Sequence, residues 1–193
     1  MARRIMIVCG SPRKKGNTNR VVGWVAEAAR EEGAEVEIVD APRLSYKALG
    51  CTACMGCRKS NEFRCVIDDD ASPIIARMPE SDVVAFASPI YWLGPAAQLK
   101  VFTDRMFSLI KFTDTGITTP LNNTSFALIA TAGGGIDHGL SLLEQTWKAV
   151  AGFLGLPFDS LLMPQCPQNP EELDNASEAR ERAAAFGRKL AGV

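Results

Sequence analysis

The sequence has almost no excess of charge of either sign and no long apolar run. Its 193 residues include 21 Lys and Arg against 22 Asp and Glu, which gives a formal net charge of −1. Proteins that bind nucleic acid neutralise its phosphates with a basic excess, so we expect no nucleic-acid partner. A membrane-spanning helix needs about 20 consecutive apolar residues. No run in this chain approaches that length, so we expect no membrane partner either.

A secretion signal and internal divisions are also lacking. The N-terminal segment is basic and then apolar, but its apolar stretch at residues 5–9 is shorter than the core of a signal peptide. We therefore expect a cytoplasmic protein whose six cysteines stay reduced, which disfavours disulfides. No repeat, low-complexity segment or linker interrupts the chain, and its length suits one α/β domain over residues 1–193.

Short apolar runs alternate with amphipathic segments along the chain. The apolar runs predict strands at residues 5–9, 36–39, 83–87, 125–131 and 156–163. The amphipathic segments predict helices at residues 21–32, 71–78, 96–110, 140–154 and 170–190. Strands that alternate with helices in this way indicate a parallel sheet covered by helices on both faces. Residues 42–70 form a long connection after the second strand, and insertions of this length are usually functional.

That insertion concentrates four of the six cysteines in the spacing C-x2-C-x2-C-x7-C. They are Cys51, Cys54, Cys57 and Cys65. An iron–sulfur cubane takes several thiolates from one short loop, and two-residue gaps let a tight turn supply them. A structural zinc site usually presents two separated C-x2-C pairs instead. The spacing therefore favours one [4Fe–4S] cluster, with free or redox-active thiols and a zinc site as the alternatives.

Three segments of unusual composition follow predicted strands, at the sheet edge where α/β proteins bind ligands. Residues 10–19 place hydroxyls, amides and cations before a helix N-terminus, which favours an anion. Their pattern is neither G-x-G-x-x-G nor G-x-x-x-x-G-K-[ST], so a single phosphate monoester fits better than a dinucleotide or a nucleoside triphosphate. A solvated basic turn is the alternative.

The other two segments suit a flat ring. Residues 88–95 hold Tyr91 and Trp92 between prolines, which makes a rigid aromatic surface. Residues 131–135 carry three consecutive glycines, so backbone amides can approach a ligand closely. Aromatics that cap the core and a merely flexible turn are the alternatives. Flavin mononucleotide (FMN) matches these three segments together, because it needs a site for one phosphate, a flat aromatic surface and a backbone surface without side chains.

The order of these motifs resembles a known family. The motifs are G-S-P-R-K-K-G-N-T at residues 10–18, the cysteine spacing followed by V-I-D-D, S-P-I-Y-W at 88–92 and Q-L-K-x-F-x-D-R at 98–105. They are similar to those of the iron–sulfur flavoproteins, in the NAD(P)H-dependent FMN reductase branch of flavodoxin-like proteins. The resemblance implies a flavodoxin-like three-layer α/β sandwich. Its five-stranded parallel sheet would have the order 2-1-3-4-5, with the cysteine-bearing insertion after strand 2.

The resemblance also implies the cofactor contacts and the assembly. The FMN phosphate would be held by Ser11, Arg13, Lys15, Asn17, Thr18 and Asn19. The isoalloxazine would pack against Pro89, Ile90, Tyr91, Trp92, Leu93 and Gly94, and against Thr131, Ala132, Gly133 and Gly134. Members of the family are dimers or tetramers with the flavin near an interface, so we expect a homodimer or homotetramer.

Two functions remain open from the sequence. The first is a redox protein that passes electrons between FMN and a [4Fe–4S] cluster, with a small molecule or a protein as redox partner. The second is an NAD(P)H-dependent FMN reductase that acts on quinones or similar acceptors without a cluster. The first function needs no side-chain acid or base, so no catalytic residue is assigned. The lone histidine, His138, receives no role.

Overall fold

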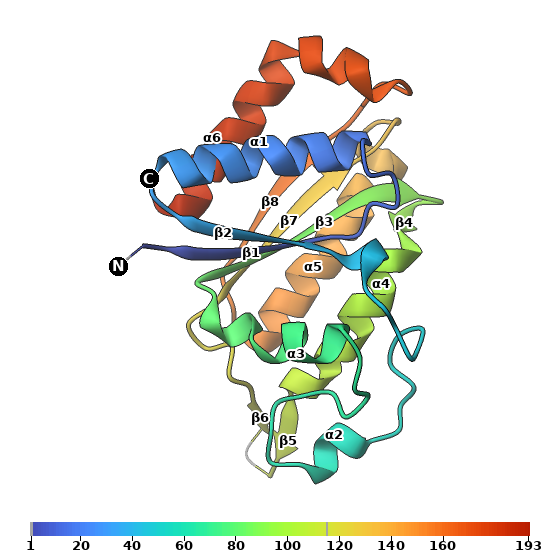
Figure 1. The fold of residues 1–193 in the computed structure, drawn as a ribbon, viewed down its shortest axis with the longest axis vertical. Helices are drawn as coiled ribbons and strands as arrows, with labels where there is room; N and C mark the ends of the chain where they lie inside the picture. The colour runs from blue at the N-terminus through green and yellow to red at the C-terminus, as the bar shows by residue number, and fades with distance from the viewer. Residues whose placement is uncertain (1, 115) are drawn as a thin grey trace.

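The fold is built on a parallel β-sheet whose strands come from all parts of the chain (Figure 1). The computed structural model describes residues 2–114 and 116–193. The parallel strands are β1 (Arg4–Cys9), β2 (Glu35–Asp40), β3 (Val83–Tyr91), β7 (Ser125–Thr131) and β8 (Phe158–Met163). They lie in the order β2-β1-β3-β7-β8. The predicted order 2-1-3-4-5 is thereby confirmed.

Helices cover both faces of the sheet, because successive side chains of a strand point to opposite faces. On one face α1 (Asn17–Glu31) and α6 (Ser177–Ala191) pack side by side (Figure 1). Gly187 allows this close approach, since a Cβ there would lie 2.3 Å from the carbonyl oxygen of Val25. The residues of β1 that face this layer are Ile5, Ile7 and Cys9.

On the other face lie α3 (Ala71–Ala76), α4 (Ala97–Thr103) and α5 (Ser141–Leu154). Trp147 of α5 stacks on Phe86 of β3, with 3.9 Å between the ring centroids. Both rings belong to one buried apolar cluster that also includes residues of α3 and α4. Stacking of this kind stabilises α5 over the middle of the sheet.

The third strand is longer than its apolar run predicts. It continues past Ala87 to Tyr91 and turns back into β4 (Gly94–Pro95), which pairs with it antiparallel. Residues 88–95 are therefore the end of a strand and a tight hairpin rather than an irregular loop. Pro89 fits within β3 near its end, where the strand is still paired with β7 on one side.

Two predicted helices are divided in the structure. The predicted helix 96–110 becomes α4 followed by a 3₁₀ segment, and the predicted helix 170–190 becomes a 3₁₀ segment followed by α6. The 3₁₀ segments are Ala41–Arg43, Met78–Glu80, Asp104–Leu109 and Pro170–Asn175, and a π-type turn, Ile136–Leu140, precedes α5. Beyond α4 the chain forms a separate antiparallel pair, β5 (Lys111–Thr113) and β6 (Gly116–Thr118).

The insertion after β2 is closed at its base. The backbone N–H of Ser45 donates to the carboxylate of Asp70 at 2.8 Å, and the N–H of Asp70 donates to the Ser45 carbonyl at 3.3 Å. Between them the chain passes through α2 (Gly56–Lys59), which lies beside β5 and β6 (Figure 1). Lys111 of β5 donates to the carbonyl oxygen of Ser60 at 2.8 Å. The insertion is therefore attached at its base and at its far end.

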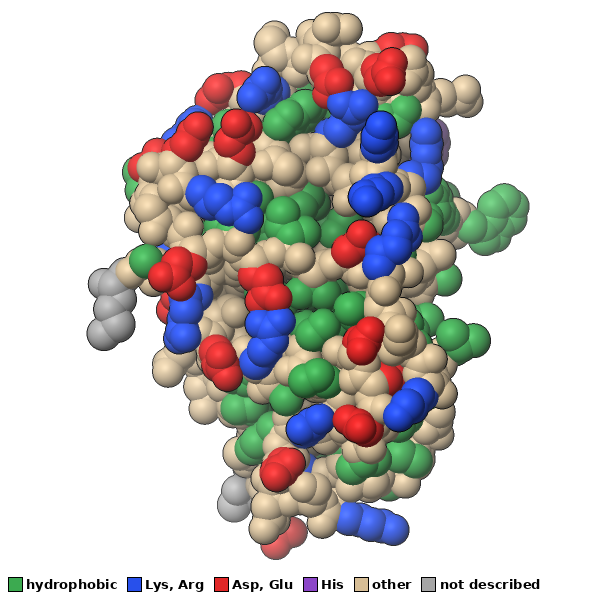
Figure 2. Space-filling view, in the orientation of Figure 1, with side chains coloured by type: hydrophobic (Ala, Val, Ile, Leu, Met, Phe, Trp, Pro, Cys, Tyr) green, Lys and Arg blue, Asp and Glu red, His purple; other side chains and the backbone are tan. Residues whose placement is uncertain are grey.

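The surface carries both signs of charge side by side. Figure 2 shows acidic and basic side chains interspersed over the face drawn, with several Lys and Arg side chains gathered near the start of α1. Arg77 and Glu37, for example, form a paired contact at 2.5 Å. No helix in the described part of the chain is both long and apolar enough to cross a membrane.

Candidate functional site

The carboxyl ends of β1, β3 and β7 bring the three predicted ligand segments to one edge of the sheet (Figure 1). The strands are adjacent and parallel, with Cys9 beside Ala87 and Pro89 beside Thr131. The N–H of Gly10 donates to the carbonyl oxygen of Ala87 at 2.8 Å, which ties the first segment to β3. The three segments therefore share the edge at which α/β sheets bind ligands.

The loop before α1 is organised around one backbone carbonyl. The Arg13 carbonyl oxygen accepts hydrogen bonds from the N–H of Gly16 at 2.8 Å and from the Asn19 amide at 3.0 Å. The hydroxyl of Ser11 donates to the same oxygen at 3.4 Å. This folding leaves the side chains of Arg13 and Lys15 exposed to solvent. Two cations therefore stand on a loop whose backbone is held in place.

The N-terminus of α1 is open toward this loop. Gly16 occupies the N-cap position, and no side chain of a described residue caps the helix there. Its first N–H groups can therefore bind an anion, which the helix dipole also favours. Gly10 is required by packing, because a Cβ at that position would lie 2.4 Å from the Cβ of Leu99 in α4. The arrangement suits one phosphate group.

Two of the predicted phosphate residues hold the segments together. The hydroxyls of Thr18 and Thr131 share a hydrogen bond of 2.7 Å, and both side chains are buried. The side-chain nitrogen of Asn17 donates to the carbonyl oxygen of Pro167 at 2.7 Å. The other end of that amide, Oδ1, is buried and has no partner among the described residues. Sequence reasoning missed Pro167, which lies in the connection after β8.

The aromatic segment forms a strained hairpin turn. Trp92 and Leu93 have φ values of +49° and +63°, a region that residues other than glycine rarely adopt. The Trp92 side chain is fully exposed and that of Tyr91 is 45% exposed, so neither caps the core. Gly139 lies against the turn, since a Cβ there would approach Ile90 to 2.6 Å. Strain of this kind clusters at ligand sites.

The glycine segment, residues 131–135, is held by two hydrogen bonds. The carbonyl oxygen of Gly134 accepts a hydrogen bond from the N–H of Gln165 at 2.9 Å. Nδ1 of His138 accepts one from the N–H of Gly135 at 3.2 Å. A Cβ at Gly134 would lie only 2.7 Å from that same nitrogen. The lone histidine, to which the sequence assigns no role, therefore holds the glycine segment through a backbone hydrogen bond.

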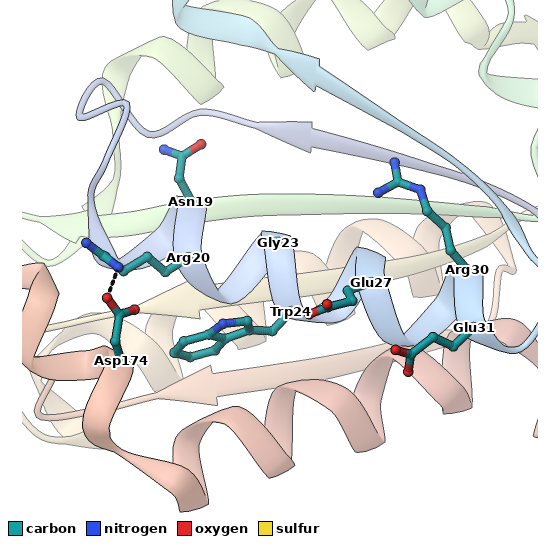
Figure 3. Close-up of a pocket in the computed structure, with 8 residues that line it drawn as sticks. All are labelled: Asn19, Arg20, Gly23, Trp24, Glu27, Arg30, Glu31 and Asp174. Carbon is teal, nitrogen blue, oxygen red and sulfur yellow. Dashed lines mark hydrogen bonds and ion pairs between the residues drawn. The ribbon is translucent and has the colours of Figure 1, made fainter.

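A separate, shallow and largely open groove runs along α1 (Figure 3). Trp24 borders it, and Arg20 and Asp174 meet in an ion pair at one end. Of the predicted cofactor residues that the structure describes, only Asn19 borders this groove, and its amide is bonded to Arg13 instead. The groove is therefore distinct from the edge where the three segments meet.

All four cysteines of the insertion line one small cavity against the 3₁₀ segment that follows α4. Gly50, Ala53 and Met55 adopt left-handed φ values of +100°, +53° and +56°. Gly56 is fixed by packing, because a Cβ there would lie 2.5 Å from a methyl carbon of Val66. These tight turns bring the four cysteines of one short segment to the same cavity.

The thiols lie close enough to influence one another. The backbone N–H of Gly56 and the hydroxyl of Thr52 lower the pKa of Cys54 below its ordinary value. Burial raises the pKa of Cys57, which Lys111 opposes and the other three cysteines reinforce. Four cysteines from one loop are the donor set of an iron–sulfur cluster, so the chemistry of the site fits that group.

The cavity is narrow as it stands. Its volume is about 20 Å³, and the described residues contain no group of three or more His, Cys, Asp or Glu arranged to hold a metal ion. Met55 is 47% exposed and Leu49 is 90% exposed, so the outer side of the loop is open to solvent.

A buried ion pair fixes the end of the insertion. Nη1 of Arg105 donates to the two carboxylate oxygens of Asp69 at 2.7 and 2.5 Å, and both side chains are buried. Asp69 also accepts from the N–H groups of Ala71 and Ser72, and so caps α3. Burial opposes its ionisation, but the Arg105 and backbone hydrogen bonds hold the pKa of Asp69 below its ordinary value. Sequence reasoning missed this pair, whose members are 36 residues apart.

An apolar groove of about 910 Å³ lies between α4 and α5. Exposed apolar side chains border it, among them Leu93, Leu142 and Phe153, each at least 50% exposed. Contiguous apolar surface of this kind marks interaction sites in proteins. The groove also adjoins the strained hairpin turn through Leu93.

The sequence has characterised relatives. Residues 3–161 match the family described as NADPH-dependent FMN reductase. An iron–sulfur flavoprotein of Methanocaldococcus jannaschii is 38% identical over 103 residues, which are 53% of this chain and 51% of that protein. This chain therefore spans about half the length of that curated relative.

The fold also has relatives among solved structures. An NAD(P)H:quinone oxidoreductase from Methanothermobacter marburgensis superposes with a TM-score of 0.77 at 17% identity, over 98% of this chain and 100% of that one. An FMN-dependent NADH-azoreductase from Bacillus anthracis, in complex with FMN, gives a TM-score of 0.72 at 15% identity, over 98% and 99%. These likenesses concern the fold, and they confirm the predicted flavodoxin-like α/β class. Because the family match covers most of the chain, this protein belongs to the NADPH-dependent FMN reductase family.

Proposed function

We propose that this protein is an FMN-dependent oxidoreductase of the iron–sulfur flavoprotein type, which passes electrons between FMN and one [4Fe–4S] cluster. The observation that carries the proposal is that all four cysteines of the insertion line a single cavity. The family match supports FMN as the cofactor, and the relative in Methanocaldococcus jannaschii is named an iron–sulfur flavoprotein. The ligands of the cluster are Cys51, Cys54, Cys57 and Cys65.

FMN is held where the three segments meet. Arg13, Lys15 and the open N–H groups of α1 hold the phosphate, while Thr18 fixes the start of α1 to the glycine segment. The hairpin at Trp92 and the backbone of residues 131–134 pack against the isoalloxazine. FMN itself supplies the two-electron and one-electron chemistry. The residues of the chain bind and orient it, and none acts as an acid or base.

One short helix separates the two cofactor sites. α4 begins next to the hairpin and leads directly into the 3₁₀ segment that borders the cysteine cavity. Its seven residues span about 10 Å at a rise of roughly 1.5 Å per residue. Tyr91 of the hairpin and Leu49, two residues before the first cysteine, border one hollow beside this helix. The two proposed sites are therefore joined by one short, continuous segment of the chain.

The partners follow from the same surfaces. NAD(P)H reduces the flavin, as the family name indicates, and the acceptor is a small molecule or a redox protein. The apolar groove between α4 and α5 is covered by a second copy of the chain in a homodimer or homotetramer. Because this groove adjoins the hairpin at Leu93, the second copy also shields the flavin.

Anaerobic reconstitution with iron and sulfide tests the proposal. We expect about four irons per chain, bound FMN, a broad visible band beside the flavin peaks and an EPR signal on reduction. Changing any one of the four cysteines to Ala should destabilise the cluster. Cys9→Ala and Cys166→Ala are the matched controls, because both thiols are buried away from the cavity and should leave the iron content unchanged. Reconstituted protein without iron or an EPR signal would refute the cluster.

A second candidate is an NAD(P)H-dependent FMN reductase that acts on quinones without a cluster. The narrow cavity and the fold of the quinone oxidoreductase from Methanothermobacter marburgensis favour it. In that case the four single Cys→Ala variants would reduce quinones with NAD(P)H at the rate of the unmodified protein. Slower electron delivery to a one-electron acceptor in these variants would instead support the cluster.

A further inference from the structure

Two buried hydrogen-bond donors without partners border the cysteine cavity. Among the residues that the structure describes, five buried side-chain polar atoms lack a hydrogen-bond partner, and two of them are Arg105 Nε and Ser108 Oγ. Both residues line the cavity that the four cysteines share, and their side chains are almost completely buried. A buried donor without an acceptor is costly, so each such group calls for an explanation, and a bound ion or ligand is one of them.

The two donors are held in one orientation. Arg105 and Ser108 are three residues apart in the 3₁₀ segment Asp104–Leu109, a spacing that places both side chains on the same face. Nη1 of Arg105 is bound to Asp69 and Nη2 donates to the carbonyl oxygen of Ile67 at 2.8 Å. The planar guanidinium is therefore fixed, and Nε is its remaining group.

The cavity provides sulfur acceptors for these donors. Cys65 and Arg105 both line this cavity, and the Cys65 thiol lies near enough to the guanidinium to interact with it electrostatically. Of the described residues that line the cavity, Arg105 is the one with a positive charge. Four thiolates and a cluster would add negative charge beside this guanidinium.

We infer that Arg105 Nε and Ser108 Oγ donate hydrogen bonds to sulfur atoms of the cluster and thereby raise its reduction potential. The inference rests on the proposed function, because it requires the cluster to be present. Hydrogen bonds to the sulfurs and a nearby positive charge stabilise the reduced, more negative state. The two residues position and tune the group, and the cysteines remain its ligands.

The test uses anaerobically reconstituted protein with its FMN. Ser108→Ala and Arg105→Lys remove the two donors, and Arg105→Lys keeps a positive charge near Asp69. Ser125→Ala and Arg77→Lys are matched controls, because their side chains bond to Asp82 and Glu37 away from the cavity. The midpoint potential of the cluster is measured by an EPR-monitored redox titration, with iron content and the FMN potential recorded on the same samples.

We expect each donor variant to shift the reduction equilibrium about tenfold toward the oxidised cluster, or about 59 mV for one electron. The FMN potential and both controls should not change. A cluster of full iron content and unchanged potential in both donor variants would overturn the inference while leaving the proposed function intact. If the unmodified protein took up no iron, both the inference and the proposed function would be wrong.

A second measurement does not depend on the Arg105 variant, which disturbs the buried ion pair. Hydrogen bonds from exchangeable protons change the Fe–S stretching frequencies in resonance Raman spectra when H₂O is replaced by D₂O. We expect this deuterium shift in the unmodified protein and a smaller shift in Ser108→Ala. Identical spectra in both solvents would show that no exchangeable donor contacts the cluster, and the inference would be wrong.

Discussion

The hydroxyl groups of Thr18 and Thr131 share a hydrogen bond of 2.7 Å, although 113 residues separate them in the chain. Thr18 lies in the first turn of α1 and Thr131 ends β7, so this contact joins the phosphate segment to the glycine segment. Neither hydroxyl is accessible to solvent. The two parts of the proposed FMN site are therefore built as one unit.

Two variants should distinguish a residue that binds FMN from a residue that holds the two segments together. Arg13→Ala removes an exposed cation that we expect to contact the phosphate, so FMN should bind about 10- to 100-fold more weakly with no change in melting temperature. Thr18→Val leaves the Thr131 hydroxyl buried without its partner, so it should weaken FMN binding and also lower stability by about 1–3 kcal/mol. Flavin fluorescence titration and thermal unfolding measure the two effects.

The control for Arg13→Ala is Lys14→Ala, which removes a neighbouring exposed cation to which no phosphate contact is assigned. The unmodified protein should bind FMN in preference to FAD or a nucleoside triphosphate, because the loop suits one phosphate. Tighter binding of FAD than FMN would contradict the assignment of all three segments.

The Asp69–Arg105 pair should dominate the stability of the insertion. Asp69→Asn leaves the Arg105 guanidinium buried without a charged partner, so we expect a loss of about 3–5 kcal/mol in the free energy of unfolding. Urea unfolding measures it. Asp68→Asn is the control, because that side chain is 85% exposed and its contact with Arg64 is long, at 3.5 Å.

The same pair predicts a pH dependence. The pKa of Asp69 is held below its ordinary value, so the unfolded chain takes up a proton before the folded chain does as the pH falls. The contribution of Asp69 is complete above the unfolded pKa of about 4 and is lost as the pH falls through the folded pKa. The stability difference between the protein and Asp69→Asn should therefore shrink between about pH 5 and pH 3. A constant difference over this interval would argue against an ionised Asp69.

Relieving the strain in the hairpin turn should raise the free energy of unfolding and lower the affinity for FMN. Leu93→Gly removes the cost of a left-handed φ at a bulky residue, so we expect a gain of about 1 kcal/mol in unfolding free energy. FMN affinity should fall, since the turn is proposed to pack on the ring. Leu49→Gly is the control, because Leu49 is also exposed but is not in the left-handed region. A destabilised Leu93→Gly would show that the turn is not strained.

The apolar groove should control the oligomeric state. Leu142→Glu and Phe153→Glu place charge on the exposed residues of this groove, so they should convert the proposed homodimer or homotetramer to monomers. Light scattering measures the mass. Phe112→Glu is the control, because Phe112 is similarly exposed on β5 outside the groove. A monomeric unmodified protein that binds FMN fully would contradict the proposal.

Local sequence patterns predict most strands of the sheet. Contacts between residues far apart in the sequence explain the features that those patterns do not predict. The strand Ser125–Thr131 is a continuous apolar run and appears with the predicted bounds. The cysteine spacing predicts a shared cavity because its gaps are short. The end of β3 was missed because Ser88 and Pro89 resemble a loop, while pairing with β7 extends the strand.

The supporting residues of the site carry no local signal. Arg105 lies in a charged, helical pattern that is typical of a surface. Its side chain is nevertheless buried, where it forms an ion pair with Asp69. His138 is isolated in sequence, and its contact with Gly135 lies in a turn that is non-helical at His138 and Gly139. Such roles become visible only when the packing is known.

The reciprocal hydrogen bonds between Ser45 and Asp70 have a consequence for how this segment can be altered. They bring the two ends of the cysteine-bearing segment together, so its length is independent of the distance between β2 and α3. The segment can therefore be exchanged for a short turn between positions 45 and 70 without altering the path of the sheet, provided that Arg105 is also replaced by an apolar residue, because its partner Asp69 is removed with the segment. Such a chain should retain the flavin-binding edge, and would provide a cluster-free form of the same protein.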